Sequence, residues 1–328
     1  MISKTIQYNS KPEKSRLFCP LNLSVSELFF SLVDYRNNYF TSDDPNKIIE
    51  FYNGFENRDQ LIQWMKERPK GVASVLEVDG DKDIIVVIPT ADFNGKYAKE
   101  CRDNIFKGLH IVFVESGEVP DQYFNYAHNC NVGIKKAMEY NPKWIVVSND
   151  DMYKIDEVKI LKNELSKIKN ADIIYTKPSN YHSTPMKIVK PNYLYQLYLR
   201  STKCGKEYLA ICKRFGIQYF PVGAELFKSI FYKKKLRYVE LRSFMIFSST
   251  FIKKENNRIF DEVFLNQTED TDLAFRLTIN YIKSFRVDYE VGNFKGSTFG
   301  TKSDRSLRSL ASLTYFTAKW EKKLNEIL

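Results

Sequence analysis

The feature that most constrains the fold of this chain is a regular alternation of apolar runs and helical segments between residues 81 and 180. Residues 84–88, "IIVVI", are a continuous β-branched run of the kind that is buried on both faces of a parallel sheet. Further strands are expected at 109–116, 144–148 and 171–176, with helices at 95–107, 123–140 and 156–169. Strands that alternate with helices of this length predict right-handed βαβ units and an open α/β sheet.

Acidic side chains stand where three of these strands end. In open α/β sheets, ligands bind beyond the carboxyl ends of the strands, so these side chains are expected to converge on one crevice. Adjacent carboxylates resist burial unless a cation meets them. The alternative is a set of ordinary turns, because Asn and Asp favour turns for local reasons. The strand ends deliver Pro89, Thr90 and Asp92, then Glu115 and Ser116, then Asn149, Asp150 and Asp151.

Length and composition limit the number of domains and the classes of protein to which the chain can belong. The chain has 328 residues, of which 43% are hydrophobic, which is enough for one large domain with additions. Residues 1–80 lack strand-helix alternation and are interpreted as an N-terminal extension with an amphipathic helix in 57–71. The five cysteines show no CxxC spacing and are expected to be reduced. Because no run of about 18 apolar residues occurs, a cytoplasmic protein is expected.

The formal net charge of +10 indicates polyanionic partners. Nucleic acid, an anionic membrane surface and phosphorylated small molecules all satisfy this condition, and charge alone does not choose among them.

A set of motifs in a fixed order resembles glycosyltransferase family 2, whose members have the GT-A fold. The resemblance covers about 84–180 and 241–320. It implies a Rossmann-like open mixed sheet flanked by helices, within a domain at 81–328 that divides into a donor half at 81–180, an insertion at 181–240 and an acceptor half at 241–328. The motifs are "VVIPTAD" at 86–92, "FVESGE" at 113–118, "CNVGIKKA" at 130–137, "NDD" at 149–151 and "RIFDEVFLNQTEDTDLAFRL" at 258–277.

The resemblance implies a donor that is a nucleotide-diphosphate sugar and a divalent cation, Mn²⁺ or Mg²⁺. Such an ion neutralises the charge that develops on the diphosphate as it leaves. Asp151 is the expected protein ligand of the metal. Asp150 is expected near the ribose or the water shell of the metal, and Glu115 at the base or ribose. The remaining residues expected at the nucleotide are Pro89, Thr90, Asp92, Asn131, Gly133 and Asn149.

The acceptor half needs a base, because a hydroxyl is a poor nucleophile at neutral pH. Asp270 is the first candidate and Glu269 the second, at the start of a helix predicted at 271–284. Capping of that helix by the segment from Thr268 is the alternative interpretation, and it is compatible with catalysis. Asp272 is expected to brace the site, with Arg276 one turn further on as its partner.

One position departs from the family pattern. The family often has a "HxxGxS" segment after the last strand of the catalytic domain, and this chain has "NFKGST" at 293–298. Asn293 therefore stands in place of the histidine that approaches the metal or the diphosphate. Lys295, Lys302 and Arg305 are candidates for supplying positive charge to the diphosphate, and an ordinary basic surface is the alternative.

Two segments are expected to contribute to acceptor recognition or to packing. Residues 181–240, rich in tyrosine and lysine, are interpreted as a helical insertion, with sugar stacking or contact with anionic lipid left open. Residues 306–328 are expected to form an amphipathic helix that packs on the catalytic domain, with peripheral membrane contact as the alternative.

The sequence thus predicts a metal-dependent glycosyltransferase, with inversion expected from the resemblance. The acceptor would be a carbohydrate, glycolipid or glycoprotein, and the protein would be cytoplasmic, with a place at the inner face of the membrane left open. Two other functions compete with this one. A sugar-1-phosphate nucleotidyltransferase would need a glycine-rich basic loop that "PTADFNGKYA" resembles poorly, and a nucleic-acid-binding protein would give no reason for the convergent acids.

Overall fold

The structure is a computed structural model that describes residues 35–117, 121–176, 182–202, 204–223, 229–294 and 304–328. Its main sheet has seven strands in the order β1-β3-β2-β4-β10-β6-β11. The pairs β2/β3 and β2/β4 are parallel, whereas β10 runs antiparallel to both β4 and β6. The strands are β1 (Ser74–Val78), β2 (Asp81–Thr90), β3 (Leu109–Glu115), β4 (Trp144–Ser148), β6 (Ile173–Tyr175), β10 (Phe244–Ser248) and β11 (Ser284–Arg286).

Helices cover both faces of this sheet, as the alternation of strands and helices predicted. Ile84, Val86 and Ile88 of β2 belong to a core shared with α4, η1 and α6. The neighbouring Ile85 and Val87 point the other way, into a core shared with α5, α9 and α10. This arrangement confirms a mixed α/β fold. The helices are α4 (Lys96–Glu100), the π-helix η1 (Cys101–Ile105), α5 (Tyr126–Met138), α6 (Val158–Ser166), α9 (Ser249–Lys254) and α10 (Glu269–Ile279).

The segment interpreted as a helical insertion contains a second sheet. Its order is β8-β7-β9, with both pairs antiparallel, and two helices accompany it. The expectation of helix alone was wrong, because the lysines that crowd "YKKKLRYVEL" conceal a strand in which Tyr238 and Glu240 alternate with exposed residues. The elements are β7 (Ser183–Pro191), α7 (Tyr193–Arg200), α8 (Gly205–Arg214), β8 (Phe220–Gly223), η2 (Ser229–Phe231) and β9 (Tyr232–Leu241).

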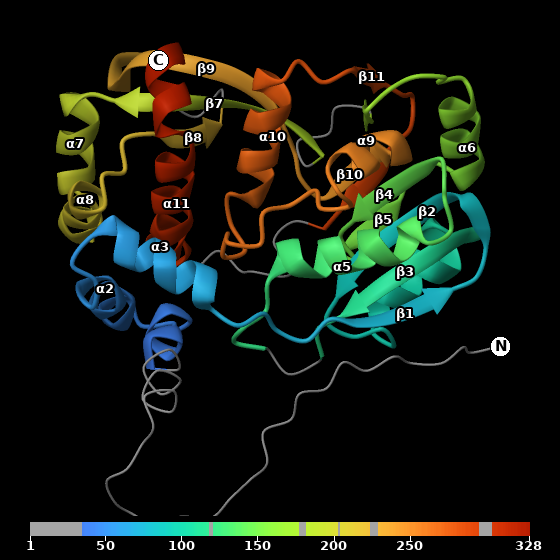
Figure 1. The fold of residues 1–328 in the computed structure, drawn as a ribbon, viewed down its shortest axis with the longest axis horizontal. Coiled ribbons are helices and arrows are strands. Elements are labelled where there is room, and N and C mark those ends of the chain that lie inside the picture. The colour runs from blue at the N-terminus through green and yellow to red at the C-terminus, as the bar shows by residue number, and fades with distance from the viewer. Residues whose placement is uncertain (1–34, 118–120, 177–181, 203, 224–228, 295–303) are drawn as a thin grey trace, which may run out of the picture.

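The two ends of the described chain meet beside this second sheet. Helix α11 (Asp304–Ile327) contacts α2 (Pro45–Asn53), α3 (Arg58–Glu67) and α8 (Figure 1). Helix α3 occupies the place predicted for a helix in 57–71, and the side chain of Asn57 caps its start. The segment 1–80 also supplies β1, which pairs with β3 at the edge of the main sheet. No helix in the described part of the chain is both long enough and apolar enough to cross a membrane.

Candidate active site

The first part of the site lies where β2 and β4 end. The strand order places β3 on one side of β2 and β4 on the other, so the crevice at the carboxyl end of β2 is a switch point in the topology. The hydroxyl of Thr90 donates a hydrogen bond of 2.8 Å to Oδ2 of Asp150 across this crevice. The structure therefore brings together the ends of these two strands, as the sequence predicted.

Asp151, the expected metal ligand, is held by a small second ladder. Strand β5 (Met152–Lys154) pairs with β12 (Val291–Asn293), which sets Asn293 opposite Met152. The side-chain amide of Asn293 donates to Oδ1 of Asp151 at 2.8 Å and to its carbonyl oxygen at 3.0 Å. The residue that departs from the family pattern thus contacts the expected metal ligand directly.

The carboxylates of Asp150 and Asp151 are both largely shielded from solvent. Burial is the largest effect on Asp150 and, with the nearby charge of Asp151, it raises the pKa of Asp150 to about 6 against the hydrogen bond from Thr90. The side chain of Asp151 is itself buried, with 5% of its surface exposed. A cation beside Asp150 would favour the charged form of this carboxylate.

The donor set fits a hard divalent ion that keeps water ligands. Within the described residues, no group of three or more His, Cys, Asp or Glu side chains is placed to hold a metal by itself. Mg²⁺ and similar ions bind through one or two carboxylates together with waters and substrate phosphates, so a complete protein cage is not required. Asp151, with Asp150 beside it, would supply the protein's share of such a site.

The other two acidic residues expected in the crevice, Glu115 and Asp92, accept hydrogen bonds from the backbone of the loop after β2. Oε2 of Glu115 accepts a hydrogen bond of 2.7 Å from the backbone N–H of Phe93. Oδ1 of Asp92 accepts one of 2.7 Å from the N–H of Asn94, as in an ordinary Asx turn. Pro89 lies inside β2, opposite Val114 of β3. The turn interpretation therefore accounts for Asp92, whereas Glu115 joins the end of β3 to the loop.

The second part of the site is a cavity of about 520 Å³ that the first part borders. Its walls come from α5, β9, the start of α10, the start of α11 and the second sheet. Asn149 reaches it from the end of β4 and accepts a hydrogen bond of 3.1 Å from the hydroxyl of Tyr126. Asn293 and the pair Glu269 and Asp270 line the same cavity. The same cavity is therefore lined by Asn149, which was expected at the nucleotide, and by Asp270, which was expected to be the base.

Glu269 is buried and Asp270 is half-buried, and both carboxylates have few partners. Burial is the main cause that raises the pKa of each, and the charge of Asp270 adds to the effect on Glu269. Glu240 raises the pKa of Asp270 further, and Arg242 opposes it. Oε2 of Glu269 has no hydrogen-bond partner among the described residues. Such a group is costly to bury, which favours a functional reason for it.

Two cavity residues were not predicted from the sequence. Glu240, 1% exposed, accepts hydrogen bonds from the hydroxyl of Thr271 and from Nε of Arg242, the latter at 2.6 Å. Both Glu240 and Arg242 line the cavity. The available signal was "VELRS" at 239–243, in which a Glu and an Arg stand two residues apart on one side of a strand. This signal was missed because the two residues lie at the border of the segment that was interpreted as an insertion.

The start of α10 is not closed by a side-chain cap. Thr268 precedes the helix in the left-handed region, with φ of 75°, and its side chain makes no capping hydrogen bond. Asp272 accepts hydrogen bonds from Lys319 at 2.9 Å and from Trp320 at 2.7 Å, so it ties α10 to α11. The expected pairing with Arg276 was wrong, because Arg276 binds Glu255 at 2.5 Å instead.

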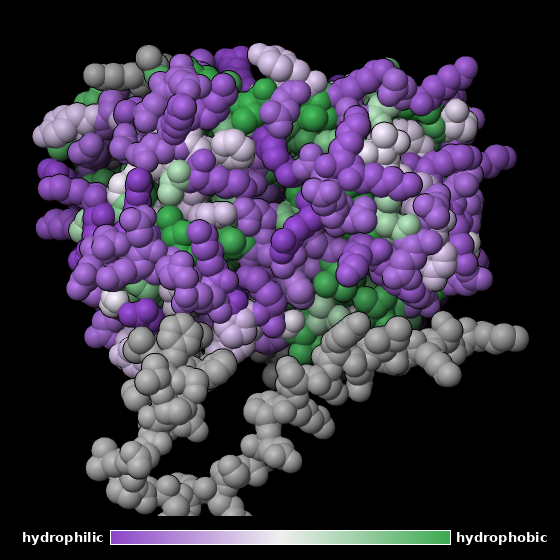
Figure 2. Space-filling view, viewed as in Figure 1, coloured by the Kyte–Doolittle hydropathy of each residue, from purple (hydrophilic) through white to green (hydrophobic). Residues whose placement is uncertain are grey.

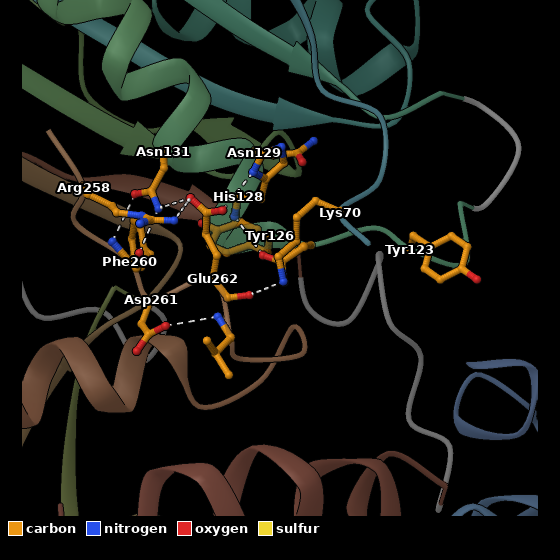
Figure 3. A network of polar contacts seen from close by, with 12 residues as sticks. Lys70, Tyr123, Tyr126, His128, Asn129, Asn131, Arg258, Phe260, Asp261 and Glu262 are labelled. Atoms are coloured by element: carbon orange, nitrogen blue, oxygen red, sulfur yellow. Dashed lines mark hydrogen bonds and ion pairs between the residues drawn. The ribbon is translucent and has the colours of Figure 1, made fainter. Parts of the chain in front are cut away.

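Asn131 and Gly133 make contacts that pack α5 against other parts of the fold, and they do not line the cavity. The amide of Asn131 donates to the carbonyl oxygen of Phe260 at 2.8 Å and to Glu262 at 2.9 Å (Figure 3). Burial alone would raise the pKa of Glu262, but hydrogen bonds from His128 and Asn131 lower it to about 2. These contacts join α5 to the loop that leads into α10.

Gly133 permits the close contact of α5 with the sheet. A Cβ atom at Gly133 would lie 2.4 Å from Cγ1 of Val87, so no larger residue fits without a shift of the helix. Of the candidate diphosphate-binding cations, Arg305 lines the cavity, whereas Lys295 and Lys302 lie outside the described residues.

A scan of the chain against protein-family models finds no matching family, and a search of curated proteins finds no match.

Proposed function

We propose that this protein is a metal-dependent glycosyltransferase of the GT-A type, which moves a sugar from a nucleotide diphosphate to an acceptor hydroxyl with inversion. The observation that carries the proposal is the shared cavity. Asn149, which precedes Asp150 and Asp151 at the end of β4, and the carboxylates Glu269 and Asp270 at the start of α10 line one space, at the edge of the sheet where α/β folds bind ligands. Resemblance of the sequence motifs to glycosyltransferase family 2 supports the same conclusion.

On the donor side, Asp150 and Asp151 would face the diphosphate. A divalent cation bound there supplies charge neutralisation for the leaving diphosphate. The hydrogen bonds from Thr90 and Asn293 hold the two carboxylates in place before the donor binds. Arg305, which lines the cavity, adds a second positive charge for the same group.

On the acceptor side, Asp270 would take the proton of the attacking hydroxyl. Its raised pKa brings it towards the operating pH, where a general base gains most from proton transfer. Glu269, with its pKa also raised, would stay protonated beside it and so would not add a second repelling charge. Arg242 lies close enough to Asp270 to limit the rise in its pKa, and it would help to keep the base ionised.

A panel of UDP-, GDP-, dTDP- and CDP-sugars, each measured by thermal shift with Mn²⁺ and with a chelator, tests the proposal. One donor should raise the melting temperature only when the cation is present. A ligand at 100 times its dissociation constant stabilises the folded state by about 2.7 kcal/mol, which such an assay resolves. If no nucleotide sugar produces a cation-dependent shift, the proposed function is wrong.

A further inference from the structure

The excess positive charge of this protein is concentrated in one segment. Residues 182–237 contain twelve Lys or Arg and two Glu, a net charge of +10, which equals the net charge of the whole chain. The remaining residues are therefore neutral in sum. The segment forms the second sheet with α7 and α8, at the end of the molecule away from the main sheet (Figure 1). A charge so localised points to a surface that meets a polyanion.

Helix α7 in this segment carries an apolar stripe that no part of the described chain covers. Tyr193, Leu194, Leu197 and Tyr198 are 63%, 48%, 42% and 53% exposed, and none of the residues of α7 is buried. Their spacing places them on one side of the helix. Ile230, 57% exposed, follows in η2, which contacts α7. On the face in Figure 2, hydrophobic residues show as separate patches among hydrophilic ones.

Other residues of α7, namely Tyr195, Gln196 and Arg200, enclose with α8 a second cavity of about 630 Å³. Its floor is apolar and aromatic, with Leu209, Ile217 and Phe220 among its walls. Four exposed cations stand at its margin, namely Lys190, Arg200, Lys206 and Lys213. A basic cavity of this kind, lined in part by a helix that also carries exposed apolar side chains, suits a phosphate head group whose acyl chains continue into an apolar phase.

We propose that the face formed by α7, α8 and η2 docks on an anionic phospholipid surface, with the stripe of α7 entering the acyl boundary and the cations binding head-group phosphates. Amphipathic helices that lie in the plane of a membrane combine these two features. Tyrosine suits the interface and leucine the acyl region beneath it. A nucleic acid would use the cations and the tyrosines for stacking, but it offers nothing for Leu194, Leu197 and Ile230.

The docking face adjoins the candidate active site. Tyr195 and Phe220 line both cavities, so they form a shared wall between the two. A membrane held against α7 and α8 would therefore lie next to the cavity that contains Asp270. The docking inference stands on charge and exposure and does not rest on the proposed function.

The test is flotation of the full chain with vesicles of phosphatidylcholine alone and with about 30% phosphatidylglycerol added. Binding is expected to the anionic vesicles only, and it should weaken as salt is raised. Lys206→Glu with Lys213→Glu should lower vesicle affinity at least tenfold, because each cation near such a surface contributes a factor of about five. Leu194→Ser with Leu197→Ser should lower it without changing its salt dependence.

The matched control reverses two exposed lysines on helices of the main sheet, Lys99→Glu with Lys253→Glu, and it should bind as the parent does. Circular dichroism of each variant verifies the fold. Equal loss in the control, or unchanged binding by the leucine variant, overturns the proposal. So does binding of the parent to double-stranded DNA or inorganic phosphate without binding to anionic vesicles.

Discussion

The candidate site has two pairs of acidic residues, one beside the cavity and one lining it, and their surroundings differ. At the edge of the main sheet, Asp150 and Asp151 each accept a hydrogen bond from a neutral side chain, Thr90 and Asn293. At the start of α10, Glu269 and Asp270 lie near a third carboxylate, and one oxygen of Glu269 has no partner among the described residues. Under the proposed function, the first pair would bind a cation, whereas the second would hold or give up a proton.

The largest expected effect comes from Asp270→Asn. Asn keeps the shape of the side chain, but it cannot take a proton as a carboxylate does. Turnover should fall on the order of 10²-fold or more, with donor affinity little changed and stability preserved to within roughly 1 kcal/mol. Steady-state transfer assays with the donor found in the panel, together with thermal unfolding, measure all three quantities.

Asp272→Asn is the matched comparison for that variant. Asp272 is two residues further along α10 and binds Lys319 and Trp320, so its loss should lower stability more than turnover. Near-normal transfer by Asp270→Asn would remove Asp270 as the base and leave Glu269 as the next candidate.

Asp151→Ala should act on binding rather than on proton transfer. Without this carboxylate, the affinity for the donor in Mn²⁺ should fall at least tenfold, and the residual affinity should match that of the parent in a chelator. Titration calorimetry provides both values. Asp83→Ala, an exposed carboxylate at the opposite end of β2, is the control and should bind as the parent does. Donor affinity of Asp151→Ala equal to that of the parent would contradict the assignment.

The raised pKa values at α10 predict how stability depends on pH. A carboxyl group whose pKa is higher in the folded than in the unfolded state contributes stability below its unfolded pKa, and loses it as pH rises through the folded pKa. The ligand-free protein should therefore lose stability as pH is raised from the ordinary carboxyl range of about 4 towards alkaline values.

Glu269→Gln should remove much of that loss, and should stabilise the protein at alkaline pH by on the order of 1–3 kcal/mol. Denaturant unfolding across the pH range measures the effect, with the exposed Glu50→Gln as control. A parent whose stability rises with pH would show that the acids of α10 are already paired.

The smallest expected effect comes from Gly133, and it tests whether this residue supports the packing of the fold or binds the nucleotide. Gly133→Ala would force a methyl group against Val87, and should destabilise the protein by about 1–2 kcal/mol with nucleotide affinity unchanged once the variant is folded. Lys135→Ala, on the exposed side of the same helix, should change neither quantity. Loss of nucleotide affinity without loss of stability would return Gly133 to the binding site.

The sequence predicted the core of the main sheet, because a strand that is buried on both faces appears in the sequence as a continuous apolar run. It also predicted that Thr90 and Asp150 lie at the same edge of the sheet, since carboxyl ends of neighbouring parallel strands share an edge, and the structure shows a hydrogen bond between them. It did not separate ligand-facing residues from structural ones. Asn131 and Gly133 occupy motif positions, yet their partners, Glu262 and Val87, come from segments whose packing only the fold reveals.

The second sheet and the contribution of β9 were harder to foresee. The lysines in its sequence mask the apolar period of β9, and β1 lies within a segment taken for a separate extension. Glu240 and Arg242 were missed for the same reason, because their place in the cavity wall depends on a strand that the pattern did not show. Long-range pairing of this sort has no local sequence signal.

The most direct test of the proposed sugar transfer is ³¹P NMR of the identified donor incubated with the parent protein, Mg²⁺ and an acceptor mixture. If the protein transfers the sugar, the resonances of the sugar-linked diphosphate will be replaced by those of a free nucleoside diphosphate. In this outcome, the bond between the sugar and the diphosphate has been broken while the diphosphate stays intact. A donor that remains unchanged, or that yields a nucleoside triphosphate and a sugar phosphate when pyrophosphate is added, would contradict the account.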